Sequence, residues 1–161
     1  MEMISIILIS GCVSVKFSLR TFCLVSVYAD EHVIRNLVAG CPLIEYLTIR
    51  SSDGFKSLEF NLNLLLLQYL SITSCCQLRS INIPSPSLKK LVINGYSLVE
   101  VKLETPNLSI FKFRGDAISF ISNALALSET DLYVDSNSDH HLWQSLWMAS
   151  SGFHLIWRLY S

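Results

Sequence analysis

Five cysteines and one adjacent pair of histidines are the residues of this 161-residue chain whose types could bind a metal or react. The cysteine count is odd, and the spacing matches no zinc pattern: Cys12, Cys23, Cys41, Cys75 and Cys76. Small buried thiols in a reducing compartment are the favoured interpretation, and a redox or metal role is the alternative. His140 and His141 have only Asp135 and Asp139 as nearby acidic partners, and adjacent side chains rarely point the same way. We interpret that segment as a solvated linker.

Motifs for catalysis and for phosphate binding are missing from the sequence. There is no G-x-S-x-G and no nucleophile beside a plausible base. Neither G-x-x-x-x-G-K nor G-x-G-x-x-G occurs. The net charge of −1 gives no electrostatic reason to expect nucleic acid or an acidic membrane surface as a partner. We therefore expect a non-enzymatic chain without cofactor or metal, whose partner is another protein.

A six-residue phrase, apolar-x-x-apolar-x-apolar, recurs along the chain and must organise whatever surface it has. Its copies start 25, 23, 21 and 20 residues apart, at Leu19, Ile44, Leu67, Leu88 and Leu108. The last three residues of each copy alternate like a strand, and such a period is typical of leucine-rich repeats. One strand of this kind cannot bury its apolar face alone, so we predict that the copies stack in parallel. A composition of 51% apolar and 16% charged residues fits coils that pack on both sides.

Weaker copies of the phrase lie between the main ones and start at Phe55, Leu78 and Leu98, 10 or 11 residues after their partners. The gaps are too short for an ordinary helix, so each central coil is predicted to contain two strands. Prolines support this register, because proline is tolerated where a strand begins but not inside a ladder. They stand two residues before the main copies, at Pro42, Pro86 and Pro106, while Leu65 fills that slot in the second repeat.

Helical signals occur in two places. Residues 29–40 are predicted to form a helix with Asp30 as its N-cap, with an apolar face, and with Gly40 as a left-handed stop. The apolar face comprises Val33, Ile34, Leu37 and Val38. Near the C-terminus a second amphipathic stripe predicts another helix, formed by Leu142, Trp143, Leu146 and Trp147.

The ends of the repeat array are less regular than its centre. Residues 1–17 are apolar but lack the basic start of a signal peptide and are too short to span a bilayer, so we expect a capping strand region. Residues 116–127 are expected to form a short helix or a distorted coil. Residues 132–134 are expected to be the last strand, with Leu132 in the slot of Phe111.

The whole pattern predicts a mostly β chain with some α, a leucine-rich-repeat solenoid over residues 1–134. We expect a right-handed coil of stacked parallel strands, one helix in the N-terminal half and a C-terminal helix. Residues 135–161 are expected to be a linker followed by a C-terminal cap or a poorly ordered tail. An interfacial membrane helix is a third interpretation of this tail, but its polar face carries almost no Lys or Arg.

Four segments resemble plant F-box proteins of the leucine-rich-repeat, FBD-associated group: residues 18–22, 38–47, 86–91 and 105–108. The Gly-Cys-Pro-Leu-x-Glu phrase at 40–45 is the most specific of them, and the similarity spans about residues 18–134. The resemblance implies the substrate-recognition repeats of a ubiquitin ligase receptor in the cytoplasm or nucleus. No F-box is recognised before residue 18 and no FBD region in 141–161, so binding of the ligase adaptor is not expected. The alternative is a truncated or degenerate gene product without stable function.

Strand alternation predicts three outward rows across the main copies, on what would be the concave face. They are Thr21, Tyr46, Tyr69, Lys90 and Ile110; Cys23, Thr48, Ser71, Val92 and Lys112; and Val25, Arg50, Thr73, Asn94 and Arg114. From these rows we take as candidate binding residues Tyr46, Thr48, Arg50, Tyr69, Ser71, Thr73, Lys90, Asn94, Lys112 and Arg114. Tyr46 and Tyr69 are the predicted anchors, while Arg50 and Arg114 suit acidic groups. The alternative is that the tyrosines only pack on each other across the ladder.

Overall fold

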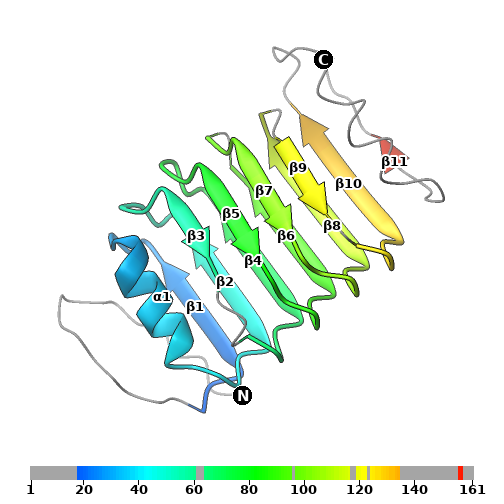
Figure 1. Ribbon diagram of the computed structural model, residues 1–161. Helices are drawn as coiled ribbons and strands as arrows, with labels where there is room; N and C mark the ends of the chain where they lie inside the picture. Colours follow the sequence, from blue (N-terminus) through cyan, green and yellow to red (C-terminus); the bar gives the residue numbers. More distant parts are fainter. Residues whose placement is uncertain are drawn as a thin grey trace.

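The computed structural model describes residues 18–60, 64–95, 97–116, 119–122, 124–134 and 156–157. Within them the chain winds through two parallel sheets that face each other, and one helix lies at the end of the smaller sheet (Figure 1). The main sheet comprises β1 (Thr21–Val25), β2 (Tyr46–Arg50), β4 (Tyr69–Thr73), β6 (Lys90–Asn94), β8 (Ile110–Gly115), β10 (Glu129–Val134) and β11 (Ile156–Trp157). The second sheet comprises β3 (Ser57–Glu59), β5 (Ser80–Ile83), β7 (Glu100–Leu103) and β9 (Ser119–Ser122).

Each strand pairs in parallel with the equivalent strand of the next coil. In the main sheet the first outward position runs Tyr46↔Tyr69↔Lys90↔Ile110, and in the second sheet Ser57 pairs with Ser80 and Ser80 with Glu100. The predicted mostly β solenoid with two strands per central coil is therefore confirmed.

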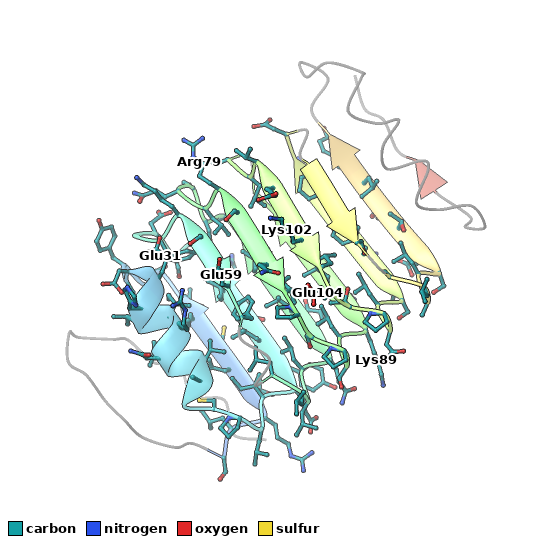
Figure 2. All side chains as sticks on the ribbon, in the orientation of Figure 1. Glu31, Glu59, Arg79, Lys89, Lys102 and Glu104 are labelled. Atoms are coloured by element: carbon teal, nitrogen blue, oxygen red, sulfur yellow. The ribbon has the colours of Figure 1, made fainter. Side chains whose placement is uncertain are left out.

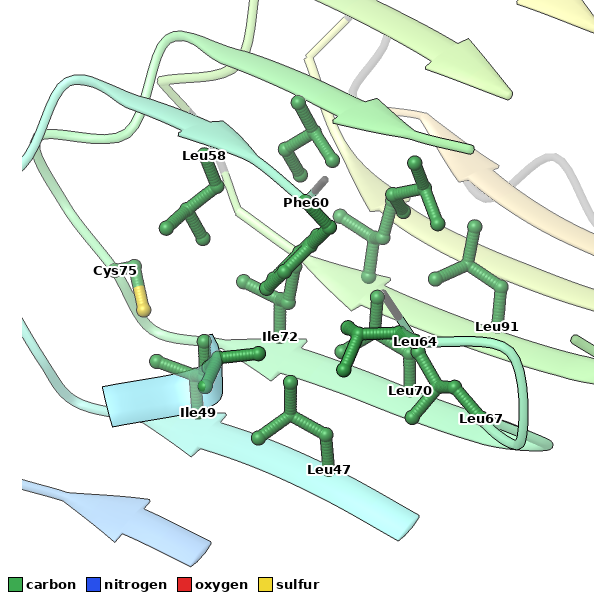
Figure 3. Close-up of a cluster of buried hydrophobic side chains, with 14 of the residues drawn as sticks. Leu47, Ile49, Leu58, Phe60, Leu64, Leu67, Leu70, Ile72, Cys75 and Leu91 are labelled. Carbon is green, nitrogen blue, oxygen red and sulfur yellow. The ribbon is translucent and has the colours of Figure 1, made fainter. Parts of the chain in front are cut away.

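The core fills the space between the two sheets (Figure 3). Leu47, Leu70 and Leu91 point inward from the main sheet and are fully buried, and Leu58 and Ile81 close the core from the second sheet. Each such side chain contributes about 1.5–3 kcal/mol through the apolar surface that it removes from water.

A tight turn precedes each of four main strands and fixes where the strand starts. Its backbone hydrogen bond joins residues three apart, as in Ile44 N–H to the Cys41 carbonyl (3.2 Å) and Leu108 N–H to the Thr105 carbonyl (3.0 Å). Proline suits the second position of such a turn because its φ is already set. Leu67 N–H makes the same bond to the Leu64 carbonyl (3.2 Å), so a leucine in the proline slot leaves the turn intact.

Helix α1 (Glu31–Ala39) takes the place in the first coil that a second-sheet strand takes later, and it packs beside β3 (Figure 1). The predicted cap is confirmed, since the Asp30 carboxylate accepts a hydrogen bond from Val33 N–H (2.9 Å). The predicted left-handed stop is wrong: Gly40 is right-handed, with φ −68° and ψ −10°. Its N–H still donates to the Asn36 carbonyl (2.9 Å), and the turn at Pro42 then redirects the chain without a left-handed residue.

The helix also supplies a hydrogen-bond acceptor to the first strand of the second sheet. Lys56 N–H donates to the Glu31 carboxylate (2.8 Å). In the next coils Arg79 N–H donates to the Lys56 carbonyl (2.7 Å), and Val99 N–H donates to the Arg79 carbonyl (2.7 Å). Glu31 thus stands where a preceding coil would place a carbonyl oxygen, and this bond lowers the pKa of its carboxyl group.

Two expectations for the C-terminal coils need correction. Residues 119–122 form β9, which pairs with β7, so a strand stands where a short helix was one of the alternatives. Residues 132–134 do belong to the strand β10, but Leu132 pairs with Phe113, and Thr130 fills the slot opposite Phe111. Thr130 is buried. Because this inward position holds a threonine and not a leucine, the spacing of leucines does not reveal the repeat here.

Several expectations fall outside the described residues. These are the capping strand region at 1–17, the linker at 135–140 and the helical stripe from Leu142 to Trp147. The strand β11 pairs with β10 through Asp131↔Ile156 and Leu132↔Trp157. In the described parts of the chain, no helix has the length and apolar character needed to cross a membrane.

Candidate functional site

The outward face of the main sheet contains the predicted rows in the predicted order. The register aligns Thr48 with Ser71 and Val92, and it aligns Arg50 with Thr73 and Asn94. The strand β10 extends each row by one residue, Glu129, Asp131 and Tyr133. Leucine spacing predicted this last strand two residues out of register, because Thr130 and not Leu132 lies opposite Phe111.

The two predicted tyrosine anchors are in contact. The ring centroids of Tyr46 and Tyr69 lie 6.3 Å apart at an interplanar angle of 38°, and Lys90 Nζ lies 5.7 Å from the centroid of Tyr69. Tyr46 keeps 46% of its surface exposed, so the pair packs across the ladder and still presents an aromatic surface. Tilted aromatic pairs and a cation over a ring are both attractive arrangements.

The middle row has fewer side chains available to a partner than the sequence indicated. Ser71 is buried, so it is poorly placed to contact a partner. Lys112 Nζ lies 2.9 Å from the Glu129 carboxylate on the neighbouring strand. This hydrogen bond and the charge of Glu129 raise the pKa of Lys112, so its ammonium group is already engaged.

The third row contains two arginines in different surroundings. Arg50 is exposed, and within the described residues no ion pair of its side chain is found. The Arg114 guanidinium lies 4.6 Å from the ring centroid of Tyr133, a neighbour that was not expected. Arg50 is therefore the cation of this row best placed to meet an acidic group.

The opposite, outward face of the second sheet has different side chains (Figure 2). One row joins Glu59, Asn82 and Lys102, and the Lys102 ammonium pairs with Glu100 of its own strand at 3.2 Å. Among the described side chains of this row none has an aromatic ring, so the row has no counterpart of the tyrosine pair.

The cysteines divide into two groups. Cys41 and Cys75 are buried as predicted, and burial raises the pKa of Cys41 and raises that of Cys75 to about 11. Such thiols stay protonated at neutral pH and are poor nucleophiles. Cys76 is exposed, so the prediction of a buried thiol is wrong there: it lies in the turn after Cys75 and points outward. Cys23 is partly exposed, and Cys12 lies outside the described residues.

In the part of the chain that the structure describes, no group of three or more His, Cys, Asp or Glu side chains is placed to hold a metal ion. The histidine pair at 140–141 lies outside that part. What the described surface offers is an aromatic pair flanked by cations on a rigid parallel sheet. Comparison of the chain with protein-family models, with curated proteins and with solved structures finds no match.

Proposed function

We propose that the outward face of the main sheet binds a protein target through Tyr46, Tyr69, Lys90 and Arg50. The observation that carries this proposal is the contact row Tyr46–Tyr69–Lys90, in which an exposed tyrosine is backed by a second ring and a cation. Tyrosine and arginine are enriched among the residues that dominate binding energy. The strands β2, β4 and β6 that carry these side chains are each hydrogen-bonded to a neighbour on both sides. The loss of backbone entropy when a partner binds is therefore small.

Charge indicates the kind of target. Within the rows, β2, β6 and β8 carry cations at Arg50, Lys90, Lys112 and Arg114, whereas the acidic residues Glu129 and Asp131 lie on β10. A partner with acidic side chains opposite β2 to β6 and apolar surface opposite the tyrosines suits this arrangement. Complementary charge of this kind selects the partner and its orientation more than it adds affinity.

The resemblance to F-box leucine-rich-repeat proteins gives this binding a biological role. On that basis we propose that the chain acts as the substrate-recognition repeats of a ubiquitin ligase receptor, in the cytoplasm or nucleus. The stacked coils and the 20- to 25-residue spacing of the main strands support the proposal.

Affinity capture with the full chain as bait tests target binding. The double variant Tyr46→Ala, Tyr69→Ala should lose a captured protein at least tenfold, since hot-spot truncations cost about 2 kcal/mol or more. The matched control Glu59→Ala, Asn82→Ala changes the opposite sheet and should retain the protein. A target that the tyrosine variant captures unchanged would place the binding surface elsewhere.

Two further measurements separate the parts of the proposal. Robust direct binding of the purified ligase adaptor by this chain would contradict the expectation that the adaptor is not bound. A single cooperative thermal transition argues against the alternative of a degenerate product without stable function.

A further inference from the structure

A groove of about 490 Å³ lies along the edge of the molecule where the main strands begin. One wall consists of turn residues from three successive coils, and the other wall of residues that precede three successive strands. The lining residues are Leu66, Ser87 and Asn107 on the first wall and Gln68, Lys89 and Ser109 on the second. The two walls are two residues apart in every coil, so the repeat itself builds the groove.

The backbone of neighbouring coils holds these walls in place. The Lys89 carbonyl accepts hydrogen bonds from Ser109 N–H (2.9 Å) and from the Ser109 hydroxyl (3.0 Å). The Asn107 amide donates to the Pro86 carbonyl (2.8 Å), which ties one turn to the next. The groove is therefore formed before any ligand arrives.

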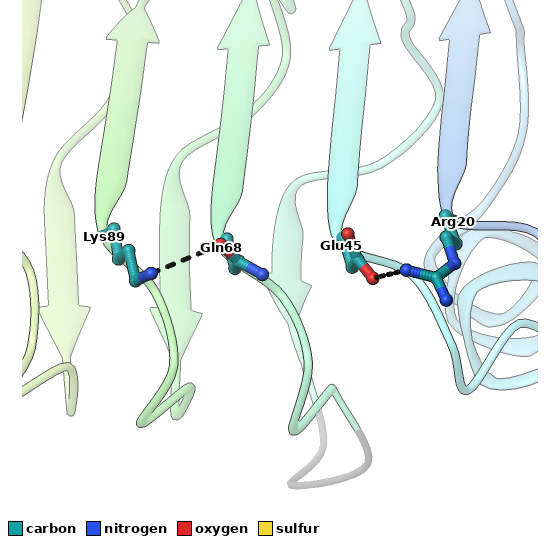
Figure 4. Close-up of polar contacts among 4 residues, drawn as sticks. All are labelled: Arg20, Glu45, Gln68 and Lys89. Atoms are coloured by element: carbon teal, nitrogen blue, oxygen red, sulfur yellow. Dashed lines mark hydrogen bonds and ion pairs between the residues drawn. The ribbon is translucent and has the colours of Figure 1, made fainter. Parts of the chain in front are cut away.

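Lys89 is the charged residue among the six that line the groove. Its Nζ lies 3.4 Å from Gln68 Oε1, in a row of pre-strand side chains that also contains the Arg20–Glu45 ion pair at 2.7 Å (Figure 4). An ammonium group has three donors, so two remain after the bond to Gln68. Next to this positive centre the groove offers acceptor oxygens on Asn107 and Ser109.

At the end of the groove nearest the N-terminal coils, Leu66 is the apolar lining residue, beside Gln68. Leu66 is 45% exposed and Leu65 is 58% exposed in the turn where other repeats have proline. Neighbouring coils of a parallel sheet lie about 4.8 Å apart, so three coils span roughly 10 Å, which is the length of about three extended residues. The groove thus presents, in order, an apolar side chain, an ammonium group and amide or hydroxyl acceptors.

We propose that this groove binds a short extended segment of a partner protein with an apolar residue followed by an acidic one. The apolar side chain lies on Leu66, the carboxylate contacts Lys89 Nζ, and the next backbone N–H donates toward Asn107 or Ser109. Complementary charge favours the acidic residue, because a hydrogen bond between an ammonium group and a carboxylate is stronger than one between neutral groups. The residues that line the groove differ from those of the adjoining tyrosine face, and the proposal does not depend on the function proposed for that face.

Amide chemical shifts of the isotope-labelled full chain test the proposal with two probes. One probe is the peptide acetyl-Gly-Leu-Glu-Ser-Gly-amide, and the other has Gln in place of Glu. The Glu probe should shift the amides of residues 66–68, 87–89 and 107–109 with millimolar affinity. The Gln probe should bind about two- to fivefold more weakly, because an exposed ion pair contributes little. Raising the salt concentration should weaken the Glu probe, because the contact with Lys89 is exposed.

Three variants decide the outcome. Lys89→Gln should weaken the Glu probe about two- to fivefold, and Ser87→Trp, which fills the groove but keeps the lysine, should abolish binding. Lys56→Gln removes an exposed lysine near the second sheet and should change nothing. Thermal melts of the variants establish that each is folded.

Equal binding of the two probes, or unchanged binding by Lys89→Gln, would overturn the proposal. Shifts that cluster at Tyr46 and Tyr69 would overturn it as well, because the peptide would then lie on the sheet face. Tyr46→Ala should leave probe binding intact, so failure of this site and failure of the tyrosine face give different results.

Discussion

The main sheet and the second sheet follow the same inward pattern but have different outward surfaces. Both present apolar side chains to one shared core, and both pair coil to coil in parallel. The central main strands are five residues long, with tyrosines, Lys90 and Arg50 facing out, whereas the second-sheet strands are three or four residues long and face out with serine, Asn82 and paired charges. Core packing imposes the same constraint on the inward positions of both sheets. A binding role can therefore distinguish the sheets only at their outward positions.

Core truncation in each sheet should give the largest effect and show whether the sheets are one unit. Leu70→Ala in β4 and Ile81→Ala in β5 should each lower the free energy of unfolding by about 2–5 kcal/mol, because both side chains are fully buried. Chemical denaturation with one transition checks this. Val99→Ala, at a side chain that is 57% exposed, is the control and should stay within about 0.5 kcal/mol. A second transition in Ile81→Ala alone would show that the second sheet melts separately.

The adjacent residues Cys75 and Cys76 lie in a connection between the two sheets, one buried and the other exposed, so their reactivities can be compared directly. Cys76 is exposed, while Cys75 is buried with a pKa of about 11 and donates its thiol proton to the Thr73 carbonyl (3.6 Å). At pH 8 we expect iodoacetamide to modify Cys76 at least about a hundredfold faster, because only a thiolate reacts. Peptide mapping by mass spectrometry measures both rates. Equal rates in the folded chain would contradict the burial of Cys75.

Two glycines in equivalent connections should respond differently to alanine. Gly54 has φ +97°, and a Cβ atom there would lie 2.7 Å from the Ala29 carbonyl oxygen, so Gly54→Ala should cost about 1–3 kcal/mol or more. Gly95 is the matched control, because its Cβ would lie at an ordinary 3.6 Å from Leu98 Cδ1. Gly95→Ala should be neutral or stabilise by up to about 1 kcal/mol, because it restricts the unfolded chain. Thermal melts measure both, and equal losses would argue against the left-handed turn at Gly54.

The smallest expected effect concerns the carboxylate that completes the second sheet. Hydrogen bonding to Lys56 N–H lowers the pKa of Glu31 below its ordinary 4.5, so its contribution is present above that pH and is lost as the pH falls through the lowered value. Glu31→Gln should therefore lower the melting temperature slightly at pH 7, and the difference should shrink below pH 4.5. Melts from pH 7 to pH 3 measure this, with Glu59→Gln as a control that keeps the same charge change. A difference that does not shrink at all between pH 7 and pH 3 would show that the charge is not responsible.

The sequence was sufficient for features that repeat and insufficient for features that occur once. Leucine spacing predicts the strands and the rows because burial imposes the same residue types in every coil. It misses the register of β10, where Thr130 replaces an apolar residue, and the burial of Ser71, which depends on neighbouring side chains. The edge groove was also missed, since its lining residues share no type and come together only when the coils are stacked.

The position of the Glu31 carboxylate also affects whether two molecules can pair through the edge of the second sheet. An open edge of a sheet presents unpaired N–H and carbonyl groups that invite a strand from a second molecule, and polymers can grow in this way. Because Glu31 occupies the donor of Lys56 and α1 lies alongside β3, that edge is blocked against such growth. The helix thus protects the β3 edge of the second sheet from intermolecular strand exchange.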